Sequence, residues 1–338
     1  MSETSEKTVA QVGEFGLIRR FQGIFRSGGA GVVRGIGDDA AAVQVSPGCL
    51  LLATTDTALE GVHFLRSTTT PRLLGQRILA VNVSDIAAMG GTPRWALISL
   101  SLPEETPLLF AEELAAGLDE EATRYRTTIV GGNVARSPDR IVVDVTLLGE
   151  ARPDRVLYRN GARPGDRLLV TGTLGDSAAG LAILLGQAPG DVPGAEYLIS
   201  RHRLPTPRVE AGLAISATGR ATAMLDLSDG LASDVGHLAE ASQVGAVIWA
   251  DRLPLSAECA ALTRIVGRDP LDWALRGGED YELLLAAPPD AVDELTAAVG
   301  RVGVELTHVG EVTSDREVVL VTPDGRRQPP GAPLWQHF

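Results

Sequence analysis

The amino-acid sequence predicts a two-domain protein of the α/β (or α+β) class. Short apolar runs with strand character alternate with longer stretches in which apolar residues recur at helical spacing, and this alternation runs through both halves of the chain. A length of 338 residues fits two domains of ordinary size. We therefore expect an N-terminal α/β domain over residues 1–150 and a C-terminal α/β domain over residues 151–338.

In the first half, three strands and two helices are expected. Apolar residues near helical spacing predict a helix over 71–89, which Gly90-Gly91 and Pro93 end. A second, acidic amphipathic helix is expected over 107–124. Short apolar or alternating runs predict strands over 50–55, 95–102 and 141–148. The segment 151–166, with its prolines, glycines and arginines, has the composition of a linker.

The second half predicts a longer series of strands, over 167–171, 224–226, 247–250, 283–286, 307–309 and 318–321. Helices are expected over 177–185 and 291–299, and a third begins after Asp226 with Leu231, Val235 and Leu238 on its inward face. Asp56 in the first half also directly follows a predicted strand. The two aspartates suggest a duplicated plan.

Charge and apolar content exclude several classes of partner. The chain carries 43 acidic and 30 basic residues, a formal net charge of −13. Nucleic-acid binding needs clustered Lys and Arg, and no five-residue basic run occurs, so we expect no nucleic-acid partner. No apolar run approaches the ~20 residues of a membrane span, so we expect no membrane partner and a cytoplasmic location.

Two scarce residue types limit the chemistry. Cys49 and Cys259 lack CxxC spacing, and we expect both to be buried core thiols. Lys7 is the only lysine, so the body of the chain offers no Schiff-base, P-loop or protein-kinase lysine. If the protein handles phosphates, metal ions and arginines must supply the positive charge.

Several carboxylates stand in turns or beside strands rather than on solvated helix faces. They are Asp38 and Asp39 behind two glycines, Asp56 after a strand, Asp85 on an apolar helix, and Asp226 and Asp229 at a strand-to-helix turn. Carboxylates brought together repel one another unless a cation neutralises them. Oxygen ligands from Asp, Thr and Ser favour Mg²⁺ over zinc or copper.

Structural explanations remain open for some of these residues. Ser228 or Asp229 could cap the helix that follows, and Asp38 and Asp39 could form an exposed pair. Asp85 has apolar helix neighbours and therefore needs a partner, because burying an unpaired charge is costly. The five histidines lack HxxxH or HExxH spacing, and no GxSxG or GxGxxG motif occurs, which disfavours a His-based zinc site, a serine hydrolase and a Rossmann dehydrogenase.

Nine motifs, in this order along the chain, resemble the thiamine-monophosphate kinase family, within the superfamily of aminoimidazole ribonucleotide synthetase, selenophosphate synthetase and a hydrogenase-maturation enzyme. The motifs are GEFGLI (13–18), GIGDDAAAV (35–43), TTDTALEGVHF (54–64), LAVNVSDIAAMGGTP (79–93), GGN (131–133), NGARPGD (160–166), VTGTLGDSAAGLA (170–182), LDLSDGLASDVGHL (225–238) and GGEDYELL (277–284).

The resemblance implies ATP-dependent, direct γ-phosphoryl transfer to thiamine monophosphate, which gives thiamine diphosphate in the last step of its biosynthesis. It implies several Mg²⁺ ions, ATP as co-substrate and no phosphoenzyme. The implied fold is the two-domain aminoimidazole ribonucleotide synthetase-like fold, and the implied assembly is a homodimer formed through N-domain strands.

Carried over by position, the resemblance implies that Asp56, Asp85 and Asp229 are catalytic. It also implies metal ligands, ATP contacts and thiamine monophosphate contacts. The implied metal ligands are Asp39, Thr54, Thr55, Asp56, Asp85, Asn133, Asp226 and Asp229. The implied ATP contacts are Gly132, Asn133, Arg159 and Ser228. The implied thiamine monophosphate contacts are His63, Glu279 and Trp335.

The residue types suit these implied roles. Arg159 can grip a phosphate as a bidentate fork, and Trp335 offers a flat π face to a cationic thiazolium. Glu279 offers a counter-charge. Alternatively, Trp335 could pack as part of the chain end, and His63 could be a satisfied core imidazole.

Asn133 departs from the family pattern, which most often has Asp after the Gly-Gly pair. Its side-chain oxygen can still ligate Mg²⁺, but it brings no charge. A protein that binds nucleotide or thiamine phosphate without turnover is therefore one alternative. A dehydrating or cyclising ATP enzyme of the superfamily is another, although the chain lacks the terminal cysteine of the hydrogenase-maturation relative and the N-terminal Cys or Sec with Lys of selenophosphate synthetase.

Overall fold

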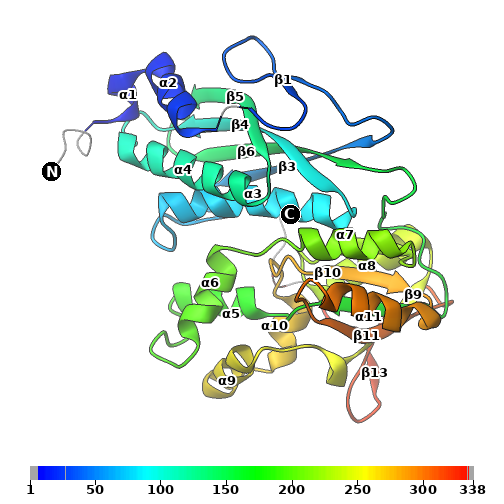
Figure 1. Cartoon of the computed structure of the whole chain (residues 1–338). Helices are drawn as coiled ribbons and strands as arrows, with labels where there is room; N and C mark the ends of the chain where they lie inside the picture. Colours follow the sequence, from blue (N-terminus) through cyan, green and yellow to red (C-terminus); the bar gives the residue numbers. More distant parts are fainter. Residues whose placement is uncertain (1–6, 27, 333, 335–338) are drawn as a thin grey trace. The chain divides into compact units, whose positions relative to one another are not determined.

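The computed structural model describes residues 7–26, 28–332 and 334, and its mixed α/β architecture confirms the expected fold class (Figure 1). The chain forms two compact units. One contains the chain up to Ile86 together with Thr92–Pro153, and the other contains Ala87–Gly91 together with the chain from Asp154 onward. Among the described residues, no helix combines the length and the apolar character needed to cross a membrane.

The first unit is built on a four-stranded mixed sheet in the order β3-β6-β4-β5. Its strands are β3 (Leu50–Leu59), β4 (Thr92–Leu102), β5 (Thr128–Arg136) and β6 (Val142–Ala151). β6 pairs antiparallel with β3 and β4, and β4 pairs parallel with the edge strand β5. Val143, Val145 and Leu147 of β6 are fully buried, because alternate side chains of a strand point to the same face.

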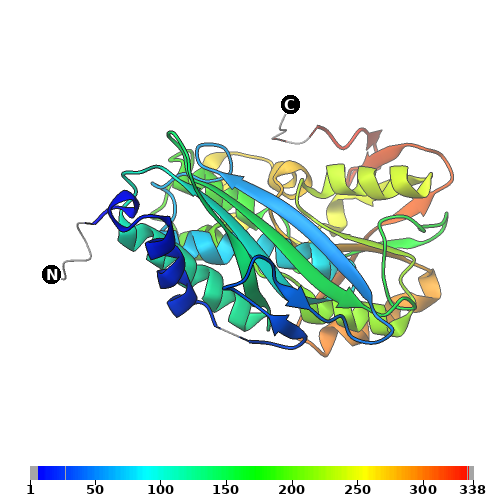
Figure 2. The same ribbon diagram turned by 90° about the horizontal axis from the view of Figure 1, so that it is seen from above.

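Helices α3 (Pro71–Ala88) and α4 (Leu108–Arg124) lie along one face of this sheet (Figures 1 and 2). Two glycines let the helix backbones meet. A Cβ at Gly117 would lie 1.9 Å from the Arg72 carbonyl oxygen, and a Cβ at Gly75 would lie 2.2 Å from the Leu114 carbonyl oxygen. Any larger residue at either glycine would force the two helices apart.

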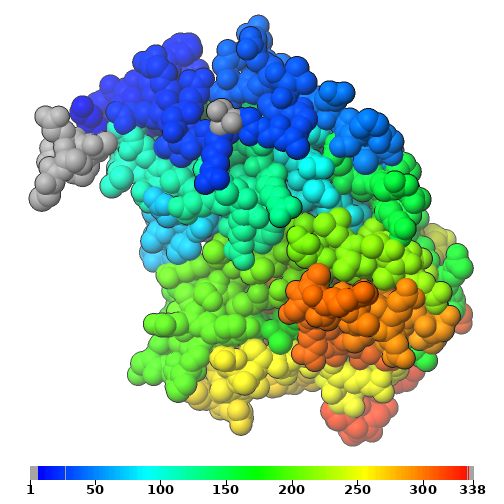
Figure 3. Space-filling model, in the orientation of Figure 1, coloured from blue at the N-terminus to red at the C-terminus, as the bar shows by residue number. Residues whose placement is uncertain are grey.

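The N-terminal segment of this unit carries α1 (Val9–Val12), α2 (Glu14–Ile24) and the short antiparallel pair β1 (Val32–Arg34) and β2 (Ala42–Val43). Asp38 and Asp39 lie between β1 and β2. The segment, blue in the space-filling view, lies at the surface (Figure 3), and the Val33 side chain is 70% exposed.

The second unit is built on a seven-stranded sheet in the order β13-β12-β9-β11-β7-β10-β8, antiparallel except between β12 and β9. Its strands are β7 (Arg167–Thr171), β8 (Ala223–Asp226), β9 (Gly245–Trp249), β10 (Leu283–Ala287), β11 (Leu306–Thr313), β12 (Val318–Val321) and β13 (Arg327–Gln328).

Helices cover both faces of this sheet. Leu168 and Val170 of β7 belong to a core with α8 (Leu231–Ser242) and α10 (Pro270–Arg276). Leu169, between them, belongs to a second core with α7 (Val209–Thr218) and α11 (Val292–Gly300). A third cluster joins α5 (Asp176–Leu184), α6 (Ala195–Arg203) and α9 (Ala257–Val266), and short 3₁₀ turns occupy Ala250–Arg252 and Pro289–Ala291.

All of the strands and helices expected from the sequence are present, within a few residues at their ends. The elements that the sequence analysis did not predict are α1, α2, α6, α7, α9, α10, β1, β2, β5 and β13. α7 illustrates why: its sequence VEAGLAISAT is apolar almost all round, so helical periodicity gives no signal. Cys259 is buried as expected, but the prediction for Cys49 is wrong, because Cys49 is only half-buried, just before β3.

Candidate active site

In the first unit, three of the candidate residues meet where β3 lies against α3. Thr54 and Asp56 share one face of β3, because they are two residues apart in a strand. The Thr54 hydroxyl donates a hydrogen bond to Oδ2 of Asp85, which α3 supplies. Thr54 is therefore a partner of Asp85, a kind of contact that the apolar setting of Asp85 required.

Asp56 lies close enough to Asp85 for their charges to interact. Although Asp56 as a residue is accessible to solvent, its carboxylate is partly enclosed by neighbouring atoms. This burial and, second, repulsion from Asp85 raise the pKa of Asp56 to about 6. A divalent cation between them would relieve both effects, so the donor set fits Mg²⁺.

Thr55 points to the other face of β3. Its hydroxyl donates to the Val145 carbonyl oxygen at 3.1 Å and lies 3.2 Å from the Thr146 hydroxyl. Strand alternation places the Thr55 side chain on the opposite face from those of Thr54 and Asp56, so its hydroxyl does not join them in one set of ligands.

Asp39, Gly132 and Asn133 line one cavity of about 460 Å³ beneath α2 and beside β4, β5 and α4. Its floor is apolar, with Phe21 and Ile98 among the lining residues. Gly132 lies so close to β4 that a Cβ would be 1.9 Å from the Ile98 carbonyl oxygen. The polar groups of this cavity thus lie beside an apolar floor of the kind that ligand pockets use.

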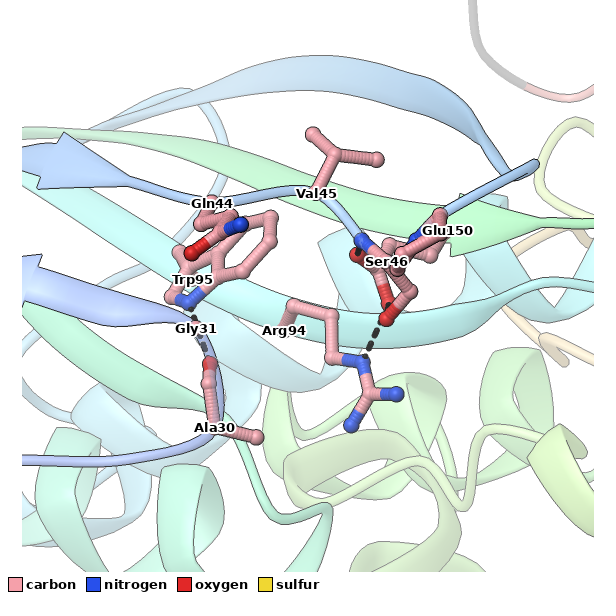
Figure 4. A pocket seen from close by; sticks show the side chains of 9 residues that line it. Ala30, Gly31, Gln44, Val45, Ser46, Arg94, Trp95 and Glu150 are labelled. Atoms are coloured by element: carbon pink, nitrogen blue, oxygen red, sulfur yellow. Dashed lines mark hydrogen bonds and ion pairs between the residues drawn. The ribbon is translucent and has the colours of Figure 1, made fainter.

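A second, smaller cavity of about 190 Å³ lies at the base of the segment that carries Asp38 and Asp39 (Figure 4). Trp95 donates from Nε1 to the Ala30 carbonyl oxygen at 2.9 Å. Glu150 accepts from the Ser46 hydroxyl and from Arg94 Nε, each at 2.9 Å. These contacts fix both ends of the segment against the sheet.

Asp38 and Asp39 themselves are exposed, which agrees with the alternative that they form an exposed surface pair. Arg34 Nε donates to Asp38 at 2.9 Å. His63 is half-buried, and its Nδ1 accepts from the Leu59 backbone N–H at 3.1 Å. This bond fits the satisfied imidazole of the alternative interpretation.

In the second unit, Asp226, Ser228 and Asp229 lie at the turn from β8 into α8. The prediction that Ser228 or Asp229 could cap this helix is wrong, because the N-cap residue is Gly230, which has no side chain to cap it. Instead, the Asp229 backbone N–H donates to Oδ2 of Asp234, one turn into α8.

Asp229, Asp234 and His237 form a cluster that the sequence analysis did not assign. Each offers one ligand atom, and these atoms lie within 4.8 Å of one another. Burial, and then repulsion from Asp229 and Asp226, raise the pKa of Asp234 well above its usual value. Asp234 and His237 lie three residues apart on one helix face, a spacing that could have revealed them.

Glu279 lies in the loop before β10, and its Oε2 is 3.7 Å from Nδ1 of His202. Arg159 is exposed and lies before β7 in the second unit. Trp335 lies outside the described residues. The structure therefore brings Thr54, Asp56 and Asp85 together in one unit, and Asp226, Ser228 and Asp229 together in the other.

The fold and these carboxylate groups define a class of protein. Residues 37–151 match the AIR synthase related protein, N-terminal domain, and residues 163–322 match the AIR synthase related protein, C-terminal domain. The hydrogenase maturation protein HypE of Escherichia coli, 20% identical with a TM-score of 0.76, shares the fold over 94% of this chain and 96% of its own.

Relatives with higher identity narrow the class. Thiamine-monophosphate kinase of Aquifex aeolicus is 39% identical over 97% of this chain and 99% of its own, and that of Salmonella typhimurium is 41% identical over 93% and 94%. The crystal structure of thiamine-monophosphate kinase from Stenotrophomonas maltophilia matches with a TM-score of 0.79 at 36% identity, over 92% of this chain and 95% of that one. AaThiL complexed with AMPPCP and TMP matches with a TM-score of 0.77 at 38% identity, over 97% and 98%. The chain belongs to the thiamine-monophosphate kinase family.

Proposed function

We propose that this chain transfers the γ-phosphoryl group of ATP directly to thiamine monophosphate, with thiamine diphosphate as the product. The observation that carries the proposal is the Asp56–Asp85 pair, in which burial and, second, repulsion from Asp85 raise the pKa of Asp56 to about 6. Family membership and the AaThiL complex with AMPPCP and TMP support the choice of substrates. The reaction would complete thiamine diphosphate synthesis.

In this proposal the acids hold several Mg²⁺ ions. Asp56, Asp85 and Thr54 supply ligands from the N-terminal domain (1–150), with Asp39, Asn133 and the backbone of Thr55, while Asp226 and Asp229 supply them from the C-terminal domain (151–338). Bound Mg²⁺ would neutralise the triphosphate and the charge that develops during transfer. No lysine is needed for that purpose.

The remaining site residues would position the two substrates. The cavity of about 460 Å³ has room for the nucleoside part of ATP, with Gly132 and Asn133 at its polar side. Arg159 and Ser228 would contact the phosphates, and His63, Glu279 and Trp335 would hold thiamine monophosphate. In a direct transfer, what these residues contribute is alignment of the acceptor phosphate with the γ-phosphoryl group.

We further propose a cytoplasmic homodimer formed through N-domain strands. The edge strand β3 supports this assembly, because Leu50 and Leu51 are 41% and 48% exposed on it. Sedimentation of the purified chain measures the oligomeric state directly.

The function is tested by incubating the protein with Mg·ATP and thiamine monophosphate and separating the products by chromatography. We expect thiamine diphosphate from the parent and about a 100-fold or larger loss of turnover in Asp56→Ala and Asp85→Ala, because charge neutralisation is the main catalytic contribution. Asp139→Ala, at a side chain that is 74% exposed in the same unit, is the matched control and should retain full turnover.

Two results would decide against parts of this proposal. Full turnover of Asp85→Ala at saturating Mg²⁺ would reject the metal assignment. A parent that binds ATP and thiamine monophosphate without forming thiamine diphosphate would be a binding protein, the alternative that Asn133 motivates.

A further inference from the structure

The loop Gly277–Glu282 has an unusual backbone. Glu279 and Tyr281 have φ values of +59° and +51°, and Gly278 between Gly277 and Glu279 has +68°. Residues with a side chain rarely adopt this left-handed region, so two of them within three positions require surroundings that hold them there. One of the two is Glu279, a candidate substrate-binding residue.

Backbone hydrogen bonds join this loop to the turn that carries Ser228 and Asp229. The Glu279 N–H donates to the Ser228 carbonyl oxygen at 2.7 Å, and the Tyr281 N–H donates to the Leu227 carbonyl oxygen at 2.9 Å. A Cβ at Gly278 would lie 2.7 Å from the same Ser228 oxygen. A shift of the loop would therefore move the Ser228–Asp229 turn as well.

Two acids that alternate with the left-handed residues anchor the loop in the protein interior. Asp280, 4% exposed, accepts from the backbone N–H of Gly175 at 2.8 Å and from that of Ser177 at 3.3 Å, at the start of α5. Glu282 is fully buried and accepts from the Thr171 hydroxyl at 2.7 Å. Neither side chain lines the cavities of about 460 Å³ and 190 Å³ described above.

Two arginines hold Glu282 from outside the loop. Arg201 of α6 donates from Nη2 to Oε1 of Glu282 at 2.8 Å. Arg208, just before α7, donates from Nε to Oε2 at 2.6 Å and from Nη2 to Oε1, in a bidentate fork. Such forks fix both position and orientation of a carboxylate.

Helix α6 brings a second contact to the same loop. His202, next to Arg201, lies 3.7 Å from Oε2 of Glu279 and 3.1 Å from the Ser177 hydroxyl. α6 in turn packs tightly on α5, since a Cβ at Gly180 would lie 2.0 Å from the Leu198 carbonyl oxygen. Arg201 and His202, adjacent on α6, therefore contact Glu282 and Glu279 respectively.

We propose that Asp280, Glu282, Arg201 and Arg208 are positioning residues that hold Glu279 and the Ser228–Asp229 turn in their working geometry. This inference rests on the proposed function, which gives thiamine monophosphate as the substrate that Glu279 binds. The anchors fix a loop whose local backbone preference opposes its observed conformation. Alignment to a fraction of an ångström is what phosphoryl transfer requires of its protein groups.

The test compares kinetic constants of Glu282→Gln and Arg208→Lys with those of the parent. We expect kcat/KM for thiamine monophosphate to fall about tenfold or more in Glu282→Gln, with a smaller change in the KM for ATP, because Glu279 lies within the strained loop itself. Arg208→Lys keeps the charge but loses the fork, so an intermediate loss is expected. A purely structural role would lower the thermal stability and the active fraction but leave both KM values unchanged.

Asp290→Asn is the matched control, because it breaks the exposed Arg220–Asp290 ion pair of 2.8 Å in the same unit and should change neither KM. Amide hydrogen exchange gives a readout that does not depend on the reaction. The amides of Glu279 and Tyr281 should exchange about tenfold faster in Glu282→Gln, while those of β9 keep the parent rate.

The two proposals fail separately. A parent that makes no thiamine diphosphate rejects the proposed function, and faster exchange at Glu279 and Tyr281 would still support the anchoring. Parent values of exchange and of both KM in folded Glu282→Gln overturn the positioning proposal. If Glu282→Gln does not fold, Arg208→Lys decides by the same measurements.

Discussion

Asn133 brings an amide to the cavity that Asp39 also lines, where a carboxylate would add one more negative charge. Beside a dication, one unit of charge is worth at most a few kcal/mol at an effective dielectric constant of about 20, and repulsion from the nearby acids offsets part of it. We expect Asn133→Asp to lower the half-saturating Mg²⁺ concentration. Asn133→Leu, which removes the oxygen, should raise it or abolish turnover. Titrating thiamine diphosphate formation with Mg²⁺ measures the half-saturating concentration in both variants.

Asn133 is exposed on β5, so neither substitution should change the thermal midpoint of the metal-free protein by more than about 2 °C. If Asn133→Leu titrates with Mg²⁺ as the parent does, Asn133 is not a ligand.

Glu121 on α4 is a residue whose charge works against folding. It is 1% exposed, its Oε1 accepts no hydrogen bond from any residue that the structure describes, and Arg124 lies 3.7 Å away. Burial, chiefly, and the charge of Glu120 raise the pKa of Glu121 to about 7. The folded state therefore binds a proton that the unfolded state releases above its ordinary pKa of 4.5, so stability falls as the pH rises from about 5 to 7.

Glu121→Gln should therefore raise the free energy of unfolding at pH 8 by up to about 3 kcal/mol and should bring little gain at pH 5. Urea unfolding at both pH values measures the difference. Glu105→Gln removes the same charge from an exposed loop position and should show no such pH dependence. An equal gain for Glu121→Gln at both pH values would contradict the raised pKa.

At the scale of elements, the approach of β5 to β4 depends on Gly132. The register of the two strands shifts between Ala96 and Leu97, and a Cβ at Gly132 would overlap the backbone of Ile98. Gly132→Ala should cost about 1–3 kcal/mol in the free energy of unfolding and weaken ATP binding, because the strand must move away. Denaturant unfolding and the Kd for ATP measure the two effects.

Gly131→Ala is the comparison on the same strand. Its Cβ would meet only the end of the Leu97 side chain, at 3.0 Å, which can rotate away. We expect a cost below about 1 kcal/mol there. Equal costs at both glycines would argue against close strand approach as the reason for Gly132.

The elements that sequence patterns missed are short ones held by packing. α6 has nine residues and buries only Ala195, Leu198 and His202, so its apolar pattern is too sparse for a helix prediction. Its stability comes from α5, against which Gly180 lets it pack. The long helices α3 and α4 were predictable because each presents several turns of apolar residues.

For the whole molecule, ligand binding should appear as added stability. ATP with Mg²⁺ at about 100 times its Kd should stabilise the fold by about 2.7 kcal/mol, whereas ATP with a chelator should stabilise it much less, because the acids and the triphosphate then repel each other. Thermal unfolding with ATP plus Mg²⁺, ATP plus chelator and Mg²⁺ alone separates these contributions. Equal midpoints with ATP in the presence and absence of Mg²⁺ would contradict a metal-mediated site.

The sequence by itself determined the fold class and the order of most strands and helices, and it predicted a site of oxygen ligands for metal ions. These follow from local patterns, such as the alternation in 141–148, the helical spacing in 71–89 and the absence of any lysine beyond Lys7. It also predicted that Asp85 needs a partner, because an unpaired charge among apolar neighbours is costly to bury.

Only the tertiary structure decided which groups meet. It brought the Thr54 hydroxyl to Asp85, 31 residues away in the chain. It bonded the Asp229 backbone to Asp234, where a helix cap was expected, and brought Arg201 and Arg208 to Glu282. It also overturned the expected burial of Cys49. A local pattern specifies which way a side chain points from its own element, whereas contacts between distant elements depend on how a whole unit packs its core.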